Sequence, residues 1–386
     1  MLVSVACSVV HARMSSFLSK YPLFPVEALH FKQRVLDLVE IYLRKQQTNP
    51  LVLSFIPVLL ALSQSSAPAE KSLAEKAKAI LVRRFDKAIE VPSIVDVEAA
   101  KKTLEEIHNT ARRTPSKEVG KACSSVSIFM AKAFNQSQAS GAGSAVAEVY
   151  KASLKDFLTR KNSKLSPSFF QDYLQRQPLH AWALREDILG YAKGDAVNDF
   201  HYLSALNLLS AVAKQFSNVV KAGEKESVES YVEECRKVLY EALETKGSAT
   251  GTWNAPRVKE VIKACLQMAR LSQVVFDTPE KLAAAWSVED LRNIELTLRQ
   301  TERLAGTNSV FTLLSQLLLL VDPKAKESRA AQKQQKQADR KRKLDEVVAA
   351  PAVTAKKGKK AKTTGVDGEK SDALPKKKKK VTSKKE

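Results

Sequence analysis

The sequence is poor in the residues that disulfide frameworks, metal centres and sheet proteins depend on. Its 386 residues include only 4 cysteines, 5 histidines, 12 glycines and 14 prolines, and aromatic residues make up 6%. Cys7, Cys123, Cys235 and Cys265 lie far apart and form no C-x-x-C pair, so we expect reduced thiols. No two histidines stand four residues apart. The pattern therefore predicts neither a metal site nor a cofactor site.

Long apolar runs are missing as well. No stretch approaches the roughly 20 apolar residues that a bilayer-spanning helix needs, so we expect no contact with a membrane. Residues 1–10 are apolar, but no basic segment precedes them and no small-residue cleavage site follows them. We interpret them as part of a packed first helix and expect the chain to stay inside the cell.

Positive charge is abundant and unevenly placed. The 63 lysines and arginines exceed the 42 acidic residues by 21. Residues 322–386 hold 22 of the basic and 9 of the acidic residues, a net of +13, whereas residues 1–321 hold 41 and 33, a net of +8. Beyond Val347 the tail has no aromatic residue and cannot bury enough surface to fold. We predict a disordered, lysine-rich tail on a mildly basic body.

The body has the periodicity of helices, and apolar residues make up 44% of the chain. Residues 30–62 show this periodicity best. Within them we expect one buried helix face, whose residues recur at three- and four-residue steps: Phe31, Val35, Leu38, Val39, Tyr42 and Leu43. Asn49 and Pro50 are typical of a helix start. The helix that they begin, residues 51–62, is apolar nearly all round, so we expect it to be buried on several sides. Pro57 predicts a kink within it.

Further helices are predicted throughout the body, at residues 2–18, 70–88, 93–113, 117–135, 145–160, 167–175, 178–193, 199–216, 224–244, 255–271, 288–304 and 309–321. Short loops and no strict sequence period favour an all-α fold, an irregular armadillo/HEAT-like helical-repeat solenoid. A globular helical bundle is the alternative. We divide the chain into helical-repeat segments 1–136 and 145–321, joined by a flexible hinge over residues 137–144 (SQASGAGS), and a basic tail, 322–386.

The tail carries three lysine-rich clusters. Two are typical of nuclear import signals, which import receptors bind in extended, exposed chains; they consist of Pro375, Lys376, Lys377, Lys378, Lys379, Lys380 and Val381, and of Arg340, Lys341, Arg342 and Lys343. The third, a candidate nucleic-acid-binding cluster, consists of Lys356, Lys357, Lys359, Lys360 and Lys362. Lysine contacts with phosphate are salt-sensitive and nearly independent of base sequence. We therefore expect nuclear import and non-specific binding to rDNA or rRNA.

Residues suited to catalysis are scarce. Asp96-Val97-Glu98 is a D-x-E sequence that would suit a metal-binding acid pair on an extended strand. We interpret Asp96 instead as part of a capping arrangement with Ser93 as the helix cap. The adjacent acids Glu105-Glu106, Glu186-Asp187 and Glu233-Glu234 diverge by about 100° on a helix and cannot hold one metal ion. Gly141-Ala142-Gly143 lacks the rest of a phosphate-binding loop. We assign no catalytic residue.

Two features of the body have both a structural and a functional interpretation. The aromatic group Phe169, Phe170, Tyr173 and Trp182 forms either core or a groove for a partner helix. The basic residues Arg112, Arg113, Lys151, Lys155, Arg160 and Lys161 are either ordinary solvated surface or an extension of the phosphate-binding tail.

The N-terminal helices also carry a family resemblance. It lies in His30-Phe31-Lys32, Arg34, Asp37-Leu38, Glu40, Tyr42-Leu43-Arg44-Lys45, Asn49-Pro50-Leu51 and residues 71–81 (KSLAEKAKAIL). Over residues 24–84 the chain resembles the DNA polymerase phi family, which also contains the Myb-binding nucleolar proteins. Family members are usually much longer, so the chain would correspond to a C-terminal portion.

The resemblance implies a role at ribosomal DNA. Together with the residues above, it predicts a non-catalytic scaffold of the nucleus and nucleolus that binds nucleic acid and transcription or ribosome-assembly proteins, in rRNA gene transcription or ribosome biogenesis. The resemblance leaves two alternatives open. One is the DNA polymerase activity after which the family is named, and the other is a transcription co-regulator that binds transcription factors.

Overall fold

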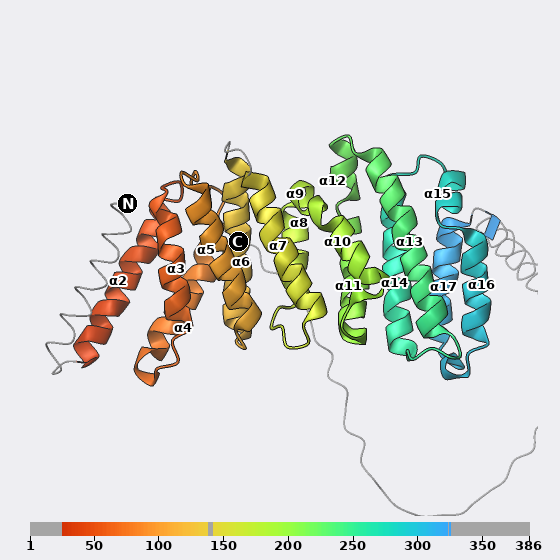
Figure 1. Cartoon of the computed structure of the whole chain (residues 1–386), viewed down its shortest axis with the longest axis horizontal. Helices are drawn as coiled ribbons and strands as arrows, with labels where there is room; N and C mark the ends of the chain where they lie inside the picture. Colours follow the sequence, from red (N-terminus) through yellow and green to blue (C-terminus); the bar gives the residue numbers. More distant parts are fainter. Residues whose placement is uncertain (1–24, 138–141, 323, 326–386) are drawn as a thin grey trace, which may run out of the picture. The chain divides into compact units, whose positions relative to one another are not determined.

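In the computed structural model, residues 25–137, 142–322 and 324–325 are described. All regular structure in these residues is helical, with no strand, which confirms the all-α prediction. Met1–Ala330 forms one compact unit and Ala331–Glu386 a second, which lies outside the described residues. The helices of the first unit follow one another broadly in sequence order (Figure 1).

The helices of this unit form two layers, each held by contacts between successive members. The first layer comprises α3 (Leu51–Ser63), α5 (Val97–Arg113), α7 (Ala142–Thr159), α9 (Pro178–Ala181), α10 (Arg185–Gly190), α13 (Lys225–Gly247) and α16 (Val288–Arg299). The second comprises α2 (Pro25–Lys45), α4 (Lys71–Ile80), α6 (Lys117–Gln136), α8 (Pro167–Arg176), α11 (Asp199–Ala213), α14 (Ala255–Ser272) and α17 (Asn308–Val321). Because α3 packs on α4, α5 on α6 and α13 on α14, the layers are built from helix pairs.

Shorter pieces connect these helices. They are the 3₁₀ turns Pro68–Glu70, Trp182–Leu184 and Glu302–Leu304, the π-helical turns Leu81–Phe85 and Tyr191–Asp195, and the helices α12 (Phe216–Lys221) and α15 (Pro279–Ala285). The predicted helix 199–216 ends where α12 begins, so α12 was not predicted, and neither was α15. The predicted helix 70–88 is interrupted, since regular α-helix ends at Ile80 and the π turn follows.

Side-chain caps fix several helix starts. Asp96 caps α5 by accepting a hydrogen bond from the Ala99 amide at 3.0 Å, so α5 begins at Val97 and not near Ser93 as expected. Val91 and Ile94 are buried in the segment before it, which holds this stretch against the core instead of in the helix. Asn198, Asn254 and Thr278 cap α11, α14 and α15 in the same way.

The buried face of α2 matches the predicted one only in part. Leu43 is buried as predicted, and Val39 and Tyr42 pack partly buried against the core. Leu36, which was not predicted, is also buried, whereas Phe31 and Leu38 are exposed. Three ion pairs join α2 to the segment around α4: Lys32 with Glu70 at 2.9 Å, Asp37 with Lys76 at 2.7 Å, and Glu40 with Arg84 at 2.6 Å. The charged side of α2 therefore faces its neighbour, and part of its apolar side faces outward. Helix α3 is likewise only partly buried, with Leu51 and Val58 exposed.

The helices on the two sides of the predicted hinge pack against each other. Residues 138–141 lie outside the described residues, but α5 and α6 both contact α7, and α6 also contacts α8. One hydrophobic core runs from Leu36 to Val321. The two predicted helical segments are thus continuous in packing.

The body extends into the predicted tail. Asp322 is buried at the end of α17, and its carboxylate accepts hydrogen bonds from Arg292 of α16 and from the Lys324 amide. These contacts lower the pKa of the Asp322 carboxyl, although burial opposes the shift. Asp322 therefore belongs structurally to the last helix pair.

Candidate interaction surfaces

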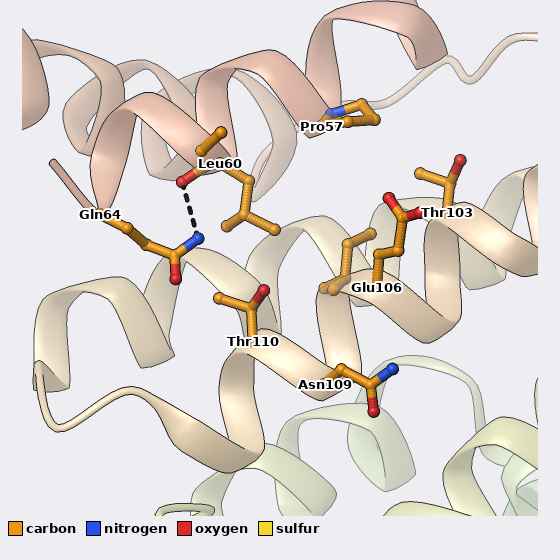
Figure 2. A pocket seen from close by; sticks show the side chains of 9 residues that line it. Pro57, Leu60, Gln64, Thr103, Glu106, Asn109 and Thr110 are labelled. Atoms are coloured by element: carbon orange, nitrogen blue, oxygen red, sulfur yellow. Dashed lines mark hydrogen bonds between the residues drawn. The ribbon is translucent and has the colours of Figure 1, made fainter.

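A groove separates α3 from α5 in the first layer (Figure 2). It has a volume of about 310 Å³ and is lined by Pro57, Leu60, Ala61 and Gln64 of α3 and by Thr103, Glu106, Ile107, Asn109 and Thr110 of α5. Most of these residues recur at three- and four-residue steps because each helix presents one face to the groove. Leu60 and Ile107 are buried, while Gln64, Glu106 and Asn109 are exposed.

The lining of the groove is suited to binding. Its apolar floor accepts an aliphatic or aromatic group, and its rim offers amides, threonine hydroxyls and one carboxylate, Glu106. The Gln64 side chain is held in place, since its amide donates to the Leu60 carbonyl at 3.2 Å. Such a combination is typical of sites that bind small apolar groups.

The two layers carry opposite net charge. The second-layer helices, with the turn Leu81–Phe85, contain 17 lysines and arginines and 8 acidic residues, a net of +9. The first-layer helices, with the turn Tyr191–Asp195, contain 14 and 17, a net of −3. The difference comes mainly from the excess of basic residues in the second layer. The second layer is therefore the side of the body that favours polyanions.

A buried polar cluster lies where α5, α6 and α7 meet. The His108 ring nitrogens Nδ1 and Nε2 lie 2.6 Å from Ser153 Oγ and 2.7 Å from Ser127 Oγ. Ser127 is also 2.7 Å from the Tyr150 hydroxyl, and Arg112 donates to Ser153 at 2.9 Å. Sequence reasoning assembled no serine–histidine set, because these residues are 19 to 45 positions apart.

This cluster is sealed from solvent. His108, Ser127, Ser153 and Tyr150 are each 0% exposed. Burial and, secondarily, the Arg112 charge lower the pKa of His108 to about 3, so the imidazole is neutral at physiological pH. A neutral ring needs one donor and one acceptor partner, which the two serine hydroxyls supply. The cluster therefore satisfies polar groups in the core and joins three helices.

The family of the chain follows from a comparison with protein-family models. The model of Myb-binding protein 1A-like TPR repeats matches residues 46–320, more than two thirds of the chain. The chain belongs to this Myb-binding protein 1A-like family. Curated protein sequences give no match.

Membership in the Myb-binding protein 1A-like family indicates a protein-interaction scaffold, because TPR-type repeats stack helix pairs into surfaces that hold partners. Polar contacts between neighbouring repeats join residues that are 38 positions apart in the sequence for Lys32–Glu70, 47 for Lys101–Glu148 and 58 for Arg257–Asp199. These steps exceed the roughly 34 residues of a TPR unit, and the first two are near the HEAT and armadillo lengths. The repeats of this family member are thus longer than the TPR motif and irregular.

The predicted tail sites lie outside the described residues. This applies to the import signals 375–381 and 340–343 and to the candidate nucleic-acid-binding lysines Lys356, Lys357, Lys359, Lys360 and Lys362. They remain predictions.

The aromatic group forms core. Phe169, Phe170, Tyr173 and Trp182 are all buried. Tyr173 stacks on Tyr150 with ring centroids 3.7 Å apart, which connects the group to the His108 cluster. Burial of both tyrosines raises the pKa of each hydroxyl.

The candidate basic residues of the first layer are partly engaged. Lys151 pairs with Asp187 at 3.0 Å, Arg160 with Asp156 at 3.1 Å, and Arg112 donates to the buried Ser153. Arg113, Lys155 and Lys161 are exposed. Half of this set therefore has acceptors within the body.

The described residues contain no cluster of three or more histidine, cysteine or acidic side chains placed to hold a metal ion. The three cysteines among them, Cys123, Cys235 and Cys265, are free and buried, and burial raises the pKa of each thiol. No helix within residues 25–137 and 142–322 is long and apolar enough to cross a membrane.

Proposed function

We propose that the protein is a non-catalytic scaffold of the nucleolus, which holds protein partners on its helical layers and nucleic acid through its basic tail. The observation that carries the proposal is the two-layer stack of helix pairs in a chain of the Myb-binding protein 1A-like family. The family name refers to Myb binding, which supports a partner of the transcription machinery. A role in rRNA gene transcription or ribosome biogenesis follows from the resemblance to the polymerase phi family.

The groove between α3 and α5 supplies the test of partner binding. Ala61 lines it and is exposed, so Ala61→Arg places a long cation in the groove without removing core volume. Ala152→Arg, at an exposed alanine of α7, is the matched control. We expect Ala61→Arg alone to remove at least one protein from the set that the wild-type chain captures from nuclear extract. Identical sets for both variants would refute the use of this groove.

Nucleic-acid binding is assigned to the tail and supported by the positive second layer. Residues 322–386 carry a net charge of +13. Each phosphate contact releases counterions, so affinity should fall steeply and linearly with salt on a double-logarithmic plot, and should depend little on base sequence. Removal of residues 354–386 should make the affinity for nucleic acid less dependent on salt. In cells, the same truncation should disperse the protein from nucleoli. A truncated chain that still concentrates in nucleoli would disprove the targeting role of the tail.

The alternative from another class is a DNA polymerase. Nucleotidyl transfer needs carboxylates that converge on Mg²⁺. Asp96, of the D-x-E sequence, is engaged as the cap of α5. The decisive assay is primer extension by the purified chain: Mg²⁺-dependent incorporation that Asp96→Ala abolishes would establish the enzyme and overturn the scaffold proposal.

A transcription co-regulator is the second alternative, and the family name favours it. Capture of partners before and after nuclease treatment distinguishes direct binding to the helical body from tethering through nucleic acid. Partners that persist after nuclease bind the helical body directly, and partners that are lost were tethered through nucleic acid.

A further inference from the structure

Two loops of the body carry six cations and no acidic residue. They are residues 112–117, where α5 ends and α6 begins, and residues 160–166, between α7 and α8. We call their basic residues the cationic edge: Arg112, Arg113, Lys117, Arg160, Lys161 and Lys164.

The two loops are held side by side. The Lys164 amide donates a hydrogen bond to the Arg112 carbonyl at 3.1 Å, although these residues lie far apart in the sequence. Burial lowers the pKa of the Arg112 guanidinium, and the charges of Arg113 and Arg160 lower it further, while acidic neighbours oppose the shift. The cationic edge is thus one cluster of positive charge and not two.

Most cations of the edge have no acceptor in the body. Asp156 of α7 pairs with Arg160 at 3.1 Å, and its second carboxylate oxygen accepts a hydrogen bond from Ser163 at 2.7 Å. Within the described residues, no ion pair is formed by the four exposed members of the edge, Arg113, Lys117, Lys161 and Lys164. By contrast, Lys78 and Arg84 each pair with a glutamate of a neighbouring helix. Unpaired cations this close together favour a polyanionic ligand.

An exposed aromatic ring adjoins the cationic edge. Phe200, near the start of α11, is 59% exposed and contacts the His201 ring, with centroids 5.2 Å apart. His201 in turn packs on Phe157 of α7 at 5.4 Å, and the Val197 amide donates to the Leu158 carbonyl at 3.0 Å. These contacts fix the start of α11 against the last turn of α7, directly before the second cationic loop.

Single-stranded nucleic acid presents the two kinds of group that such a surface binds. Its phosphates pair with exposed lysines and arginines, and its unstacked bases pack on exposed aromatic rings. We propose that the cationic edge and Phe200 form a binding site for single-stranded nucleic acid on the helical body. The cations contact phosphates, and the Phe200 ring stacks on a base. This site rests on the nucleic-acid binding proposed above and adds a second contact to that of the tail.

An acidic protein segment fits the same surface less well. Peptides that bind folded domains are commonly anchored by apolar side chains in pockets or grooves. No large hydrophobic side chain is exposed within residues 112–117 or 160–166, where Leu165 is buried. A duplex also fits less well, because its stacked bases offer no face to Phe200.

Photocrosslinking of the full chain measures the body and the tail separately. A short oligouridylate that contains 4-thiouridine is bound below saturation and irradiated, and mass spectrometry then gives the crosslink yield of each peptide. We expect crosslinks in the peptides of both cationic loops as well as in the tail. Unlabelled oligouridylate should remove the loop crosslinks, whereas an RNA duplex at equal phosphate concentration should remove far fewer of them. Equal removal by the duplex refutes a single-strand site.

Phe200→Leu tests the stacking contact, because it removes the ring but keeps an apolar side chain. Stacking of one base contributes at least about a factor of five to affinity, so loop crosslinks should fall at least about fivefold relative to tail crosslinks. The matched control is Phe31→Leu, since Phe31 of α2 is 57% exposed and lies outside the edge. It should leave the yields unchanged, and an equal loss in both variants contradicts the role of Phe200.

Lys161→Glu tests the cations. Lys263→Glu, at an exposed lysine of α14, makes the same change of net charge outside the edge. Only Lys161→Glu should lower the yield in the loop peptides. The buried thiols Cys123, Cys235 and Cys265 should resist alkylation in every variant, which verifies that the body remains folded.

The outcomes separate this site from the function on which it rests. Crosslinks confined to the tail, or loop yields that neither Phe200→Leu nor Lys161→Glu changes, overturn the body site and leave nucleic-acid binding by the tail in place. Absence of any crosslink overturns both. If Lys161→Glu instead loses a captured protein while its oligouridylate yields stay unchanged, the edge belongs to a protein partner and the proposal is wrong.

Discussion

His108 makes the stability of the body depend on pH, and the direction follows from its burial. In the unfolded chain an ordinary histidine has a pKa near 6.5, whereas burial and the Arg112 charge lower the folded-state pKa of His108 to about 3. Between these values the unfolded chain binds a proton that the folded chain does not. Stability from this group is therefore complete above pH 6.5 and falls as pH falls toward 3.

The size of the effect follows from the same two values. Each pH unit in this window changes the free energy of unfolding by about 1.4 kcal/mol, so lowering the pH from 7.5 to 5.0 should cost about 2 kcal/mol through His108. His180 and His201, whose pKa values burial also lowers, contribute in the same direction.

His108→Gln isolates the contribution of His108. Glutamine keeps an amide and a carbonyl for Ser127 and Ser153 but does not titrate. Because His180 and His201 remain, the variant should lose about 2 kcal/mol less stability between pH 7.5 and 5.0 than the wild-type chain. His30→Gln, at an exposed histidine of α2, controls for the loss of a histidine.

The measurement should be local, because repeat proteins often unfold in parts. Amide hydrogen exchange of peptides from α5, α6 and α7 at the two pH values reports the opening free energy of the helices that the cluster joins. Equal losses in the wild-type and His108→Gln chains would refute the assignment of a neutral, buried imidazole.

Two further predictions concern stability. Ser127→Ala removes the hydrogen-bond partner of His108 Nε2 and of the Tyr150 hydroxyl, and it should destabilise the protein by about 1–3 kcal/mol in denaturant unfolding. Ser125→Ala removes only a 3.4 Å contact with Asp86 and should cost clearly less; equal losses would contradict this. Arg84→Ala removes two hydrogen bonds to a half-buried Glu40 and should cost about 1 kcal/mol. The control is Arg83→Ala, at an exposed arginine that contacts the same carboxylate at 3.3 Å; it should change the free energy of unfolding by no more than about 0.5 kcal/mol. A larger loss for Arg83→Ala than for Arg84→Ala would contradict the assignment of the main contact to Arg84.

Several features were predictable because their cause is local. Helix periodicity depends on residues three and four positions apart, and most predicted helices are present with ends within a few residues. A capping arrangement of Ser93 and Asp96 at this helix start was also predicted, but the cap is Asp96 and not Ser93. The interruption at Leu81–Phe85 was not predicted, because a π turn has no strong signature in residue types.

The candidate sites were less predictable. The groove between α3 and α5 depends on which faces two helices present to each other, and its lining combines residues about 40 to 50 positions apart. The choice between core and groove for Phe169 and Trp182 likewise required the tertiary structure, because an aromatic stripe has the same spacing in either role.

The sequence by itself determined the helical class, most helix positions and the concentration of positive charge after residue 321, since each follows from composition or from short-range spacing. Only the tertiary structure decided which apolar residues of α2 are buried. Leu36 is buried while Phe31 and Leu38 are exposed, and α2 is joined by ion pairs of Lys32, Asp37 and Glu40 to partners about 40 positions later. Such a choice depends on contacts between repeats, which no local pattern encodes.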